Sequence, residues 1–154
     1  MESEWWIALG AAVGVGMLSG AVPIAAAEAT ALGAAAVPSP TLRMAVIVAF
    51  TAGHVLGKGL WYWLGTLERR VTRPSLRAWI DRAHTLAAQH PTLGLSVTFS
   101  SATISLPPFH LMAVTAGLVR TPVAPFFLVA FAGRLVRFSL IAASPAVLQW
   151  LWPW

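Results

Sequence analysis

The chain has 154 residues, of which 58% are hydrophobic and only 10% are charged. A soluble domain usually carries about 25% charged residues, so this composition excludes an ordinary soluble protein and predicts a single membrane domain. The formal net charge is +5, and the absence of cysteine excludes disulfides and thiolate metal sites.

The first apolar stretch, Trp5 to Val37, is too long for one straight crossing, since about 20 residues span a bilayer. Gly20 and Pro23 interrupt it and Glu28 follows, so we expect the helix to break between Gly20 and Pro23 and turn back. The stretch is therefore predicted to be a helical hairpin inside the membrane. Because two glutamates precede it, where a signal peptide would carry Lys or Arg, we expect it to remain in the mature protein.

The second stretch, Leu42 to Leu67, is predicted to be a full crossing. The loop that follows, Glu68 to Thr92, contains half of the arginines and lysines of the chain and is expected to face the cytoplasm: Arg69, Arg70, Arg73, Arg77 and Arg82. Apolar residues from Leu76 to Ala87 fall at helical spacing, which predicts a short amphipathic helix on the membrane surface or, equally, a solvated linker helix. A basic stretch between membrane segments favours phospholipid head groups as partners and argues against nucleic acid.

The third stretch, Leu93 to Val119, repeats the design of the first. Adjacent prolines at 107 and 108 exclude a regular helix there, so a second hairpin is predicted, with its break between Ser105 and Pro108. The fourth stretch, Val123 to Trp152, is predicted to be the second full crossing.

The predicted fold is an all-α integral membrane protein, an inverted repeat of two re-entrant helical hairpins and two transmembrane helices. Residues 1–66 form one half, 67–92 the cytoplasmic loop and 93–154 the other half, with both termini outside. Such repeats recur in secondary transporters, whose sites lie at broken helices near the midplane. The alternative is five or six ordinary helices with kinks.

Six ionisable residues lie within the apolar stretches and are the candidate substrate-binding residues: Glu28, His54, Lys58, His110, Arg134 and Arg137. A charge in the bilayer centre costs roughly 2.5 to 3.5 kcal/mol on insertion scales, so these groups should face a polar interior. Spacings of three and four place His54 with Lys58, and Arg134 with Arg137, on one helix face each. One acid cannot neutralise three bases, so the excess positive charge indicates an anionic guest.

Other interpretations of these residues stay open. The charges could be internal ion pairs that only specify packing, and Lys58 could snorkel to the cytoplasmic surface. His54 and His110 could couple transport to protons, or be hydrogen-bonded packing residues. We predict no metal site, because no histidines have suitable spacing, and no cofactor. No nucleophile elbow is visible, so an enzyme is not expected.

Three glycine pairs have small-xxx-small spacing: Gly10 with Gly14, Gly16 with Gly20, and Gly53 with Gly57. Such pairs let helices approach closely. We expect them to pack hairpin against crossing within the chain, although they also allow a homo-oligomer.

Four segments resemble the DedA family, also called the SNARE-associated or VTT-domain superfamily, and its short members in particular. Gly20 to Glu28 (GAVPIAAAE) is similar to the first re-entrant motif, and Gly53 to Gly65 to the glycine-spaced helix that follows. Phe99 to Gly117, with its two prolines, is similar to the second re-entrant motif. Gly133 to Phe138 (GRLVRF) resembles the Gly-Arg-x-x-Arg signature of the final helix.

The resemblance implies two opposed re-entrant hairpins and movement of phospholipids or polyprenyl phosphates, such as undecaprenyl phosphate, between leaflets. The chain departs from the longer members, which have arginines in the second hairpin, and His54 stands where an acid is frequent. We therefore expect a carrier of an anionic lipid in the plasma (inner) membrane of a bacterium, crossing it several times. The alternatives are a proton-coupled transporter of small anions and a non-transporting scaffold or assembly factor.

Overall fold

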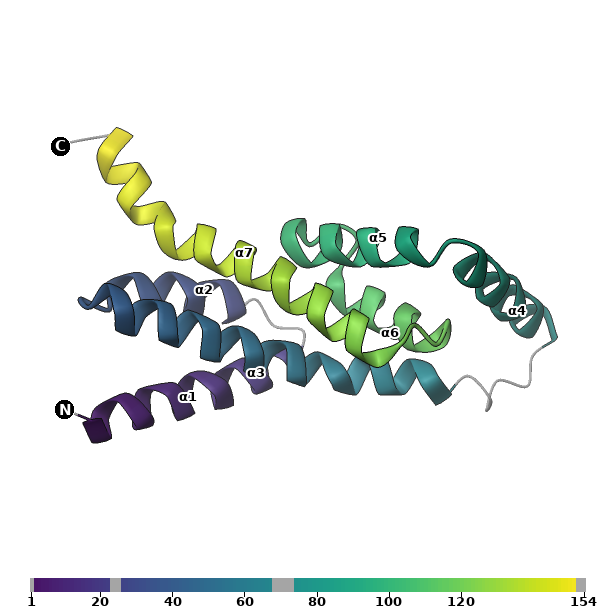
Figure 1. Ribbon diagram of the computed structural model, residues 1–154, viewed down its shortest axis with the longest axis horizontal. Coiled ribbons are helices and arrows are strands. Elements are labelled where there is room, and N and C mark those ends of the chain that lie inside the picture. Colours follow the sequence, from purple (N-terminus) through teal and green to yellow (C-terminus); the bar gives the residue numbers. More distant parts are fainter. Residues whose placement is uncertain (1, 23–25, 68–73, 152–154) are drawn as a thin grey trace. The chain divides into compact units, whose positions relative to one another are not determined.

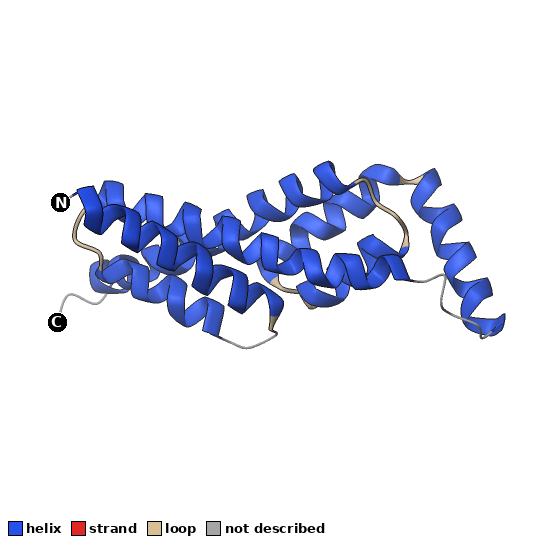
Figure 2. Ribbon diagram, turned by 90° about the horizontal axis from the view of Figure 1, so that it is seen from below, coloured by secondary structure: helices blue, strands red, loops and turns tan. Residues whose placement is uncertain are grey.

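The computed structural model describes residues 2–22, 26–67 and 74–151 (Figure 1). Figure 2 shows helices and connecting loops throughout this part of the chain and no strand, which confirms the all-α prediction for it. Among the described residues, two helices are long and apolar enough to cross a membrane: α3 (Pro40–Thr66) and α7 (Val123–Leu151), the latter over Val123–Pro145. They coincide with the two predicted crossings.

The first predicted hairpin consists of α1 (Glu2–Ala21), α2 (Ala26–Gly33) and a 3-10 turn, η1 (Ala34–Ala36). In Figure 1, α2 runs in the direction opposite to that of α1. The break begins later than predicted, because Gly20 is still helical and packs against the backbone of α3. Val22 is bent, as expected for a residue before proline, and the predicted break at Pro23 lies outside the described residues.

The second hairpin consists of α5 (Pro91–Ile104) and α6 (Phe109–Leu118), which also lie antiparallel (Figure 1). The predicted non-helical backbone between Ser105 and Pro108 is confirmed, and its position inside the membrane stays a prediction. Ser105 is left-handed with φ 66°, the Leu106–Pro107 peptide is cis, and Pro108 precedes α6. The hydroxyl of Ser101 donates to the carbonyl of Pro107 at 2.5 Å, so a side chain of α5 satisfies backbone exposed by the break.

The helix α4 (Pro74–Gln89) occupies the predicted loop, with Ile80 buried on one side. Its exposed side carries Arg77, whose Nε lies 3.5 Å from the carboxylate of Asp81. A helix in the loop is therefore confirmed, and its position on a membrane surface stays a prediction.

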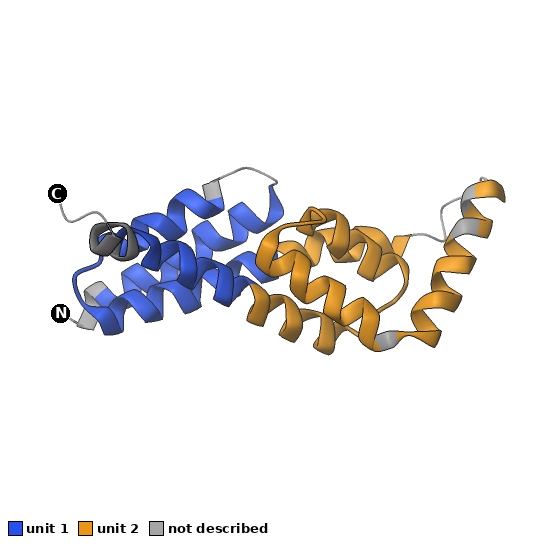
Figure 3. Cartoon of the chain, turned by 90° about the horizontal axis from the view of Figure 1, so that it is seen from above, with its two compact units in different colours: residues 1–57, 134–154 blue, residues 58–133 orange. Residues whose placement is uncertain are grey.

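The chain forms two compact units, coloured in Figure 3. The first comprises residues 1–57 and 134–154, and the second comprises residues 58–133. Each unit thus contains one hairpin, one part of α3 and one part of α7. The units therefore differ from the predicted halves, residues 1–66 and 93–154, because α3 and α7 are each divided between the two units.

The core of the first unit is built mainly from small residues of α1, α2, α3 and α7, around Phe50 and Phe138. Here the backbones of α1 and α3 touch. A Cβ on Gly16 would overlap the carbonyl oxygen of Phe50, and one on Gly57 would overlap that of Met17. Internal packing is therefore confirmed for two of the predicted glycine pairs, whereas a Cβ on Gly10 or Gly14 would meet nothing within 4 Å.

In the second unit, glycines likewise let a helix of the hairpin, α6, pack closely against α3. A Cβ on Gly65 of α3 would overlap the carbonyl of Val114 in α6, and one on Gly117 would overlap that of Tyr62. The ring of Tyr62 packs 5.1 Å from that of Phe126, and its hydroxyl donates to the carbonyl of Thr121 at 2.6 Å. These contacts fix α6 and the turn after it against α3.

Candidate functional site

The first unit brings together four of the six predicted residues: Glu28 from α2, His54 from α3, and Arg134 and Arg137 from α7. The Nη2 and Nε atoms of Arg137 donate to Oε1 of Glu28 at 3.1 and 3.3 Å. Glu28 lies in the first turn of α2, where the positive end of the helix dipole favours an acid. The two side chains remain 39% and 23% exposed, for Glu28 and Arg137 respectively, so this ion pair is accessible from outside the unit.

Arg134 lies one helical turn before Phe138 and is only 5% exposed. Its Cζ atom is 5.8 Å from the centroid of the Phe138 ring, a distance at which the negative face of an aromatic ring attracts a cation. Glu28, Arg134 and Arg137 have a summed formal charge of +1. The cluster therefore keeps an excess of positive charge after the Glu28–Arg137 pair has formed.

His54 is 3% exposed and has a defined hydrogen bond. Its Nδ1 lies 3.0 Å from the hydroxyl of Ser19, and that hydroxyl also donates to the carbonyl of Gly16 at 2.8 Å. Because serine has one hydroxyl proton, Nδ1 of a neutral His54 must be the donor to Ser19. The imidazole is further held by the ring of Phe138, 5.3 Å away and nearly perpendicular.

An apolar groove of about 280 Å³ lies beside this cluster, between α1, η1, α2, α3 and α7 of the first unit. Apart from Thr30, its lining is aliphatic or aromatic and includes Phe50 and Phe138. The Phe138 ring is thus shared, since it both lines the groove and lies beneath the Arg134 guanidinium. A cationic centre and an apolar groove are therefore adjacent.

The remaining two predicted residues belong to the second unit. Lys58 is 4% exposed there, and the ring of His110 packs 5.7 Å from that of Trp61. Whether they take part in substrate binding stays a prediction. Within the described chain, no three His, Asp or Glu side chains are grouped closely enough to hold a metal ion.

Two residues of the cluster were not predicted from the sequence. Ser19 holds His54 and Phe138 contacts Arg134. Phe138 follows Arg134 by four residues, a helical spacing that could have indicated their contact. Ser19 has no such signal, because its partner is 35 residues away in the chain.

In a comparison with known protein families, the model of the VTT domain matches residues 5–144 of the chain. This segment includes all six candidate residues. No curated protein and no solved structure matches the chain.

Proposed function

The chain belongs to the VTT-domain family, whose members are associated with membrane transport, and on this premise we propose that it carries an anionic lipid from one leaflet to the other. The protein acts as a carrier rather than an enzyme. The substrate class is a phospholipid or a polyprenyl phosphate such as undecaprenyl phosphate. Its location is the inner membrane of a bacterium, which it crosses several times.

The observation that carries the proposal is the double contact of Phe138. The ring lies 5.8 Å from the Cζ atom of a buried guanidinium, and the same residue lines an apolar groove. A lipid phosphate has the same two parts, an anionic head group joined to an apolar tail. A small inorganic anion would use the cationic cluster and leave the groove without a role, so this geometry favours a lipid.

The charge of the cluster supports the same substrate. A net charge of +1 inside a bilayer is costly, and an anionic guest would neutralise it. Guanidinium groups present paired donors that match phosphate oxygens. Arg134 binds the phosphate directly, and Arg137 exchanges Glu28 for it when the lipid enters.

In this proposal, the two hairpins are re-entrant segments with breaks inside the membrane. A non-helical backbone survives there only where it is buried in protein or faces water. The bond from Ser101 to the carbonyl of Pro107 supports this, because it satisfies the break of the second hairpin from within the protein.

The decisive test is reconstitution of the purified chain in liposomes with a fluorescent undecaprenyl phosphate or phosphatidylglycerol in one leaflet. We expect protein-dependent appearance of the label in the other leaflet, measured by its loss to a membrane-impermeant quencher. Protein-free liposomes and liposomes with heat-inactivated protein are the controls. No protein-dependent movement of either lipid would favour a scaffold, and uptake of a small labelled anion without lipid movement would favour an anion transporter.

The topology can be tested separately, because the chain has no cysteine. Single cysteines at Ser3 and Ser75 report the N-terminus and the Arg-rich loop. We expect an impermeant thiol reagent to reach position 3 from outside the cell and position 75 only after the membrane is opened. Labelling of both from the same side would contradict the inverted repeat.

A further inference from the structure

The charged cluster and the apolar groove of the first unit follow one another in a fixed order along its helices. On α1, the groove residues lie between Ala8 and Val15, and Ser19 of the cluster comes after them. On α3, the groove residues lie between Val46 and Phe50, and His54 comes after them. On both helices, the groove therefore precedes the cluster.

The order is reversed on the two helices that run in the opposite direction. In α2, the groove residues Thr30 and Ala31 come after Glu28, and in α7 Phe138 comes after Arg134. Figure 1 shows that α2 and α7 run opposite to α1 and α3. All four helices thus place the cluster at the same end of the site, and the groove extends from it towards the side where α1 and α3 begin.

The far end of the groove is closed by the turn between η1 and α3. Val37 lines the groove there. The Nε and Nη2 atoms of Arg43 donate to the carbonyl of Val37 at 3.1 and 2.8 Å. These two donors of Arg43 are therefore used by the backbone of the protein itself, and the guanidinium holds the turn. The phosphate-binding end of the site is the cluster, as the carrier proposal has it.

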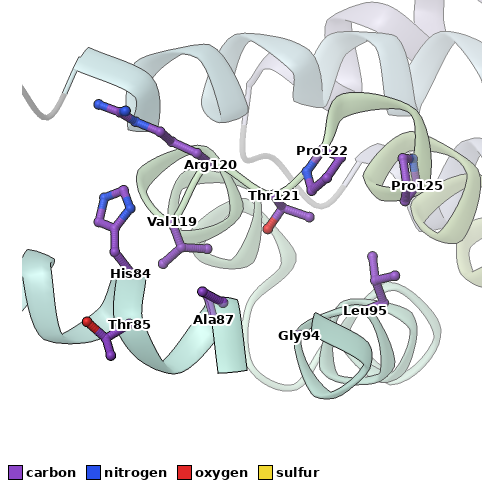
Figure 4. Close-up of a pocket in the computed structure, with 11 residues that line it drawn as sticks. His84, Thr85, Ala87, Gly94, Leu95, Val119, Arg120, Thr121, Pro122 and Pro125 are labelled. Atoms are coloured by element: carbon purple, nitrogen blue, oxygen red, sulfur yellow. The ribbon is translucent and has the colours of Figure 1, made fainter. Parts of the chain in front are cut away.

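The second unit has a pocket of about 700 Å³ that lacks this arrangement (Figure 4). Arg120, Leu95 and Pro125 all line it. Figure 4 shows the guanidinium of Arg120 pointing away from Leu95 and Pro125. In the first unit, by contrast, Phe138 lies near the Arg134 guanidinium and also lines the groove. The first unit is therefore the better place to bind a head group and its tail together.

We propose that the carrier site binds its lipid in one orientation, with the head group at the cluster and the tail directed along the groove towards Val37. This inference rests on the proposed carrier function. Since α3 is predicted to cross the membrane, the head group then faces the side on which α3 ends. A lipid has this orientation in the leaflet on that side, which is the cytoplasmic leaflet in the predicted topology. A lipid from the opposite leaflet must turn over before its tail can enter the groove.

The test uses two photoreactive phosphatidylglycerols, which carry a diazirine on one acyl chain either beside the ester or near the middle of the chain. The full chain is irradiated with each probe in liposomes, and the labelled residues are identified by mass spectrometry of its peptides. We expect the ester-side probe to label Thr30 and Phe138, beside the cluster. The mid-chain probe should label Ala8 and Val37, towards the far end of the groove.

A leucine in the groove provides the matched variant. Ala11 lines the groove and is exposed, so Ala11→Leu narrows the groove without repacking the core. It should lower groove labelling by the mid-chain probe at least about tenfold, as filling an apolar pocket implies. Gly10→Leu is the control, because Gly10 is the exposed neighbour on α1, does not line the groove, and a Cβ there meets nothing within 4 Å. Its labelling should be parental.

The reverse pattern, with the ester-side probe at Ala8 and Val37, would overturn the proposed orientation. So would equal labelling of both ends by each probe, absence of label in the groove, or parental labelling in Ala11→Leu. The liposome translocation assay keeps this result separate from the carrier function. Translocation with reversed labelling would end the orientation alone, whereas the expected labelling without translocation would support the orientation and end the carrier function.

Discussion

The two units pack a hairpin against α3 in the same way, and they differ in the side chains that the hairpin contributes. Each presses a broken hairpin against α3 at glycines that leave no room for a Cβ, Gly16 and Gly57 in the first unit and Gly65 and Gly117 in the second. In the first unit, the hairpin contributes Glu28 to a cluster that includes two arginines of α7. In the second, the hairpin contributes hydroxyl groups in place of charges.

The hydroxyl groups of the second hairpin are used by its own backbone. Thr98 donates to the carbonyl of Gly94 at 2.8 Å, Thr103 to that of Phe99 at 2.9 Å, and Ser101 to that of Pro107. The two threonine bonds stay within single turns of α5, and the serine bond joins α5 to the break. The comparison indicates that the second hairpin packs through glycine contacts and hydroxyl groups, and a role of the ionisable cluster of the first unit beyond packing stays a prediction.

The largest effect should follow from changing the arginines of the first unit. We predict that Arg134→Ala and Arg137→Ala lower lipid translocation per folded molecule by about 10- to 100-fold, because each removes charge-assisted hydrogen bonds to phosphate. Lysine at either position should rescue only partly, since an ammonium lacks the paired donors. The measurement is the liposome assay, with the folded fraction determined by gel filtration.

Arg77→Gln is a suitable control for this experiment, because its arginine is exposed and paired with Asp81 on α4. It should translocate lipid at the parental rate. Parental rates per folded molecule in both Arg134→Ala and Arg137→Ala, accompanied by lower melting temperatures, would assign the cluster a structural role only.

The shared glycine contacts predict matched losses of stability in the two units. Gly57→Ala and Gly117→Ala each place a methyl group against a backbone carbonyl, of Met17 and Tyr62 respectively. Overpacking of this kind typically costs about 1 to 3 kcal/mol, and a rigid backbone neighbour should place these variants at the upper end. Thermal unfolding in detergent measures the effect.

Gly10→Ala is the control, since a Cβ at Gly10 meets nothing within 4 Å. It should be neutral or stabilising by up to about 1 kcal/mol, because alanine is the better helix former. Equal melting temperatures for Gly10→Ala and Gly57→Ala would show that the close approach of α1 and α3 is not needed in the folded protein.

A smaller effect is expected for the acid. Glu28→Gln removes the charge that pairs with Arg137 and keeps the shape of the side chain. We predict about a tenfold loss of translocation together with tighter retention of phosphatidylglycerol, because the empty cluster would then have a higher positive charge. Loss of translocation with unchanged lipid retention would contradict an exchange of Glu28 for the lipid phosphate.

Much of the fold could be predicted from the sequence. Apolar stretches long enough to cross a bilayer define α3 and α7, and paired prolines fix the break before α6. The first break was placed too early, because a glycine within an apolar stretch indicates a break or a close helix contact equally well. Gly20 lies at a close contact with the backbone of α3.

The site was predictable in its charges and not in its geometry. Ionisable residues in apolar stretches are visible in the sequence, so Glu28, Arg134 and Arg137 could be chosen as candidates. The pairing of Glu28 with Arg137 depends on how α2 lies against α7, 109 residues away, which no local pattern encodes.

The smallest predicted effect concerns the break of the second hairpin. Ser101→Ala removes the donor to the carbonyl of Pro107 and should cost about 1 kcal/mol, because that backbone group is left without this bond inside the protein. Thr115→Ala is the matched control, since its hydroxyl donates to the carbonyl of Leu111 one turn earlier in α6, and it should cost less than about 0.5 kcal/mol. Thermal unfolding of both variants gives the difference, and translocation per folded molecule should be parental in each. A loss of translocation in folded Ser101→Ala would show that the second break belongs to the transport path, so that the chemical division between the two units is less complete than their side chains indicate.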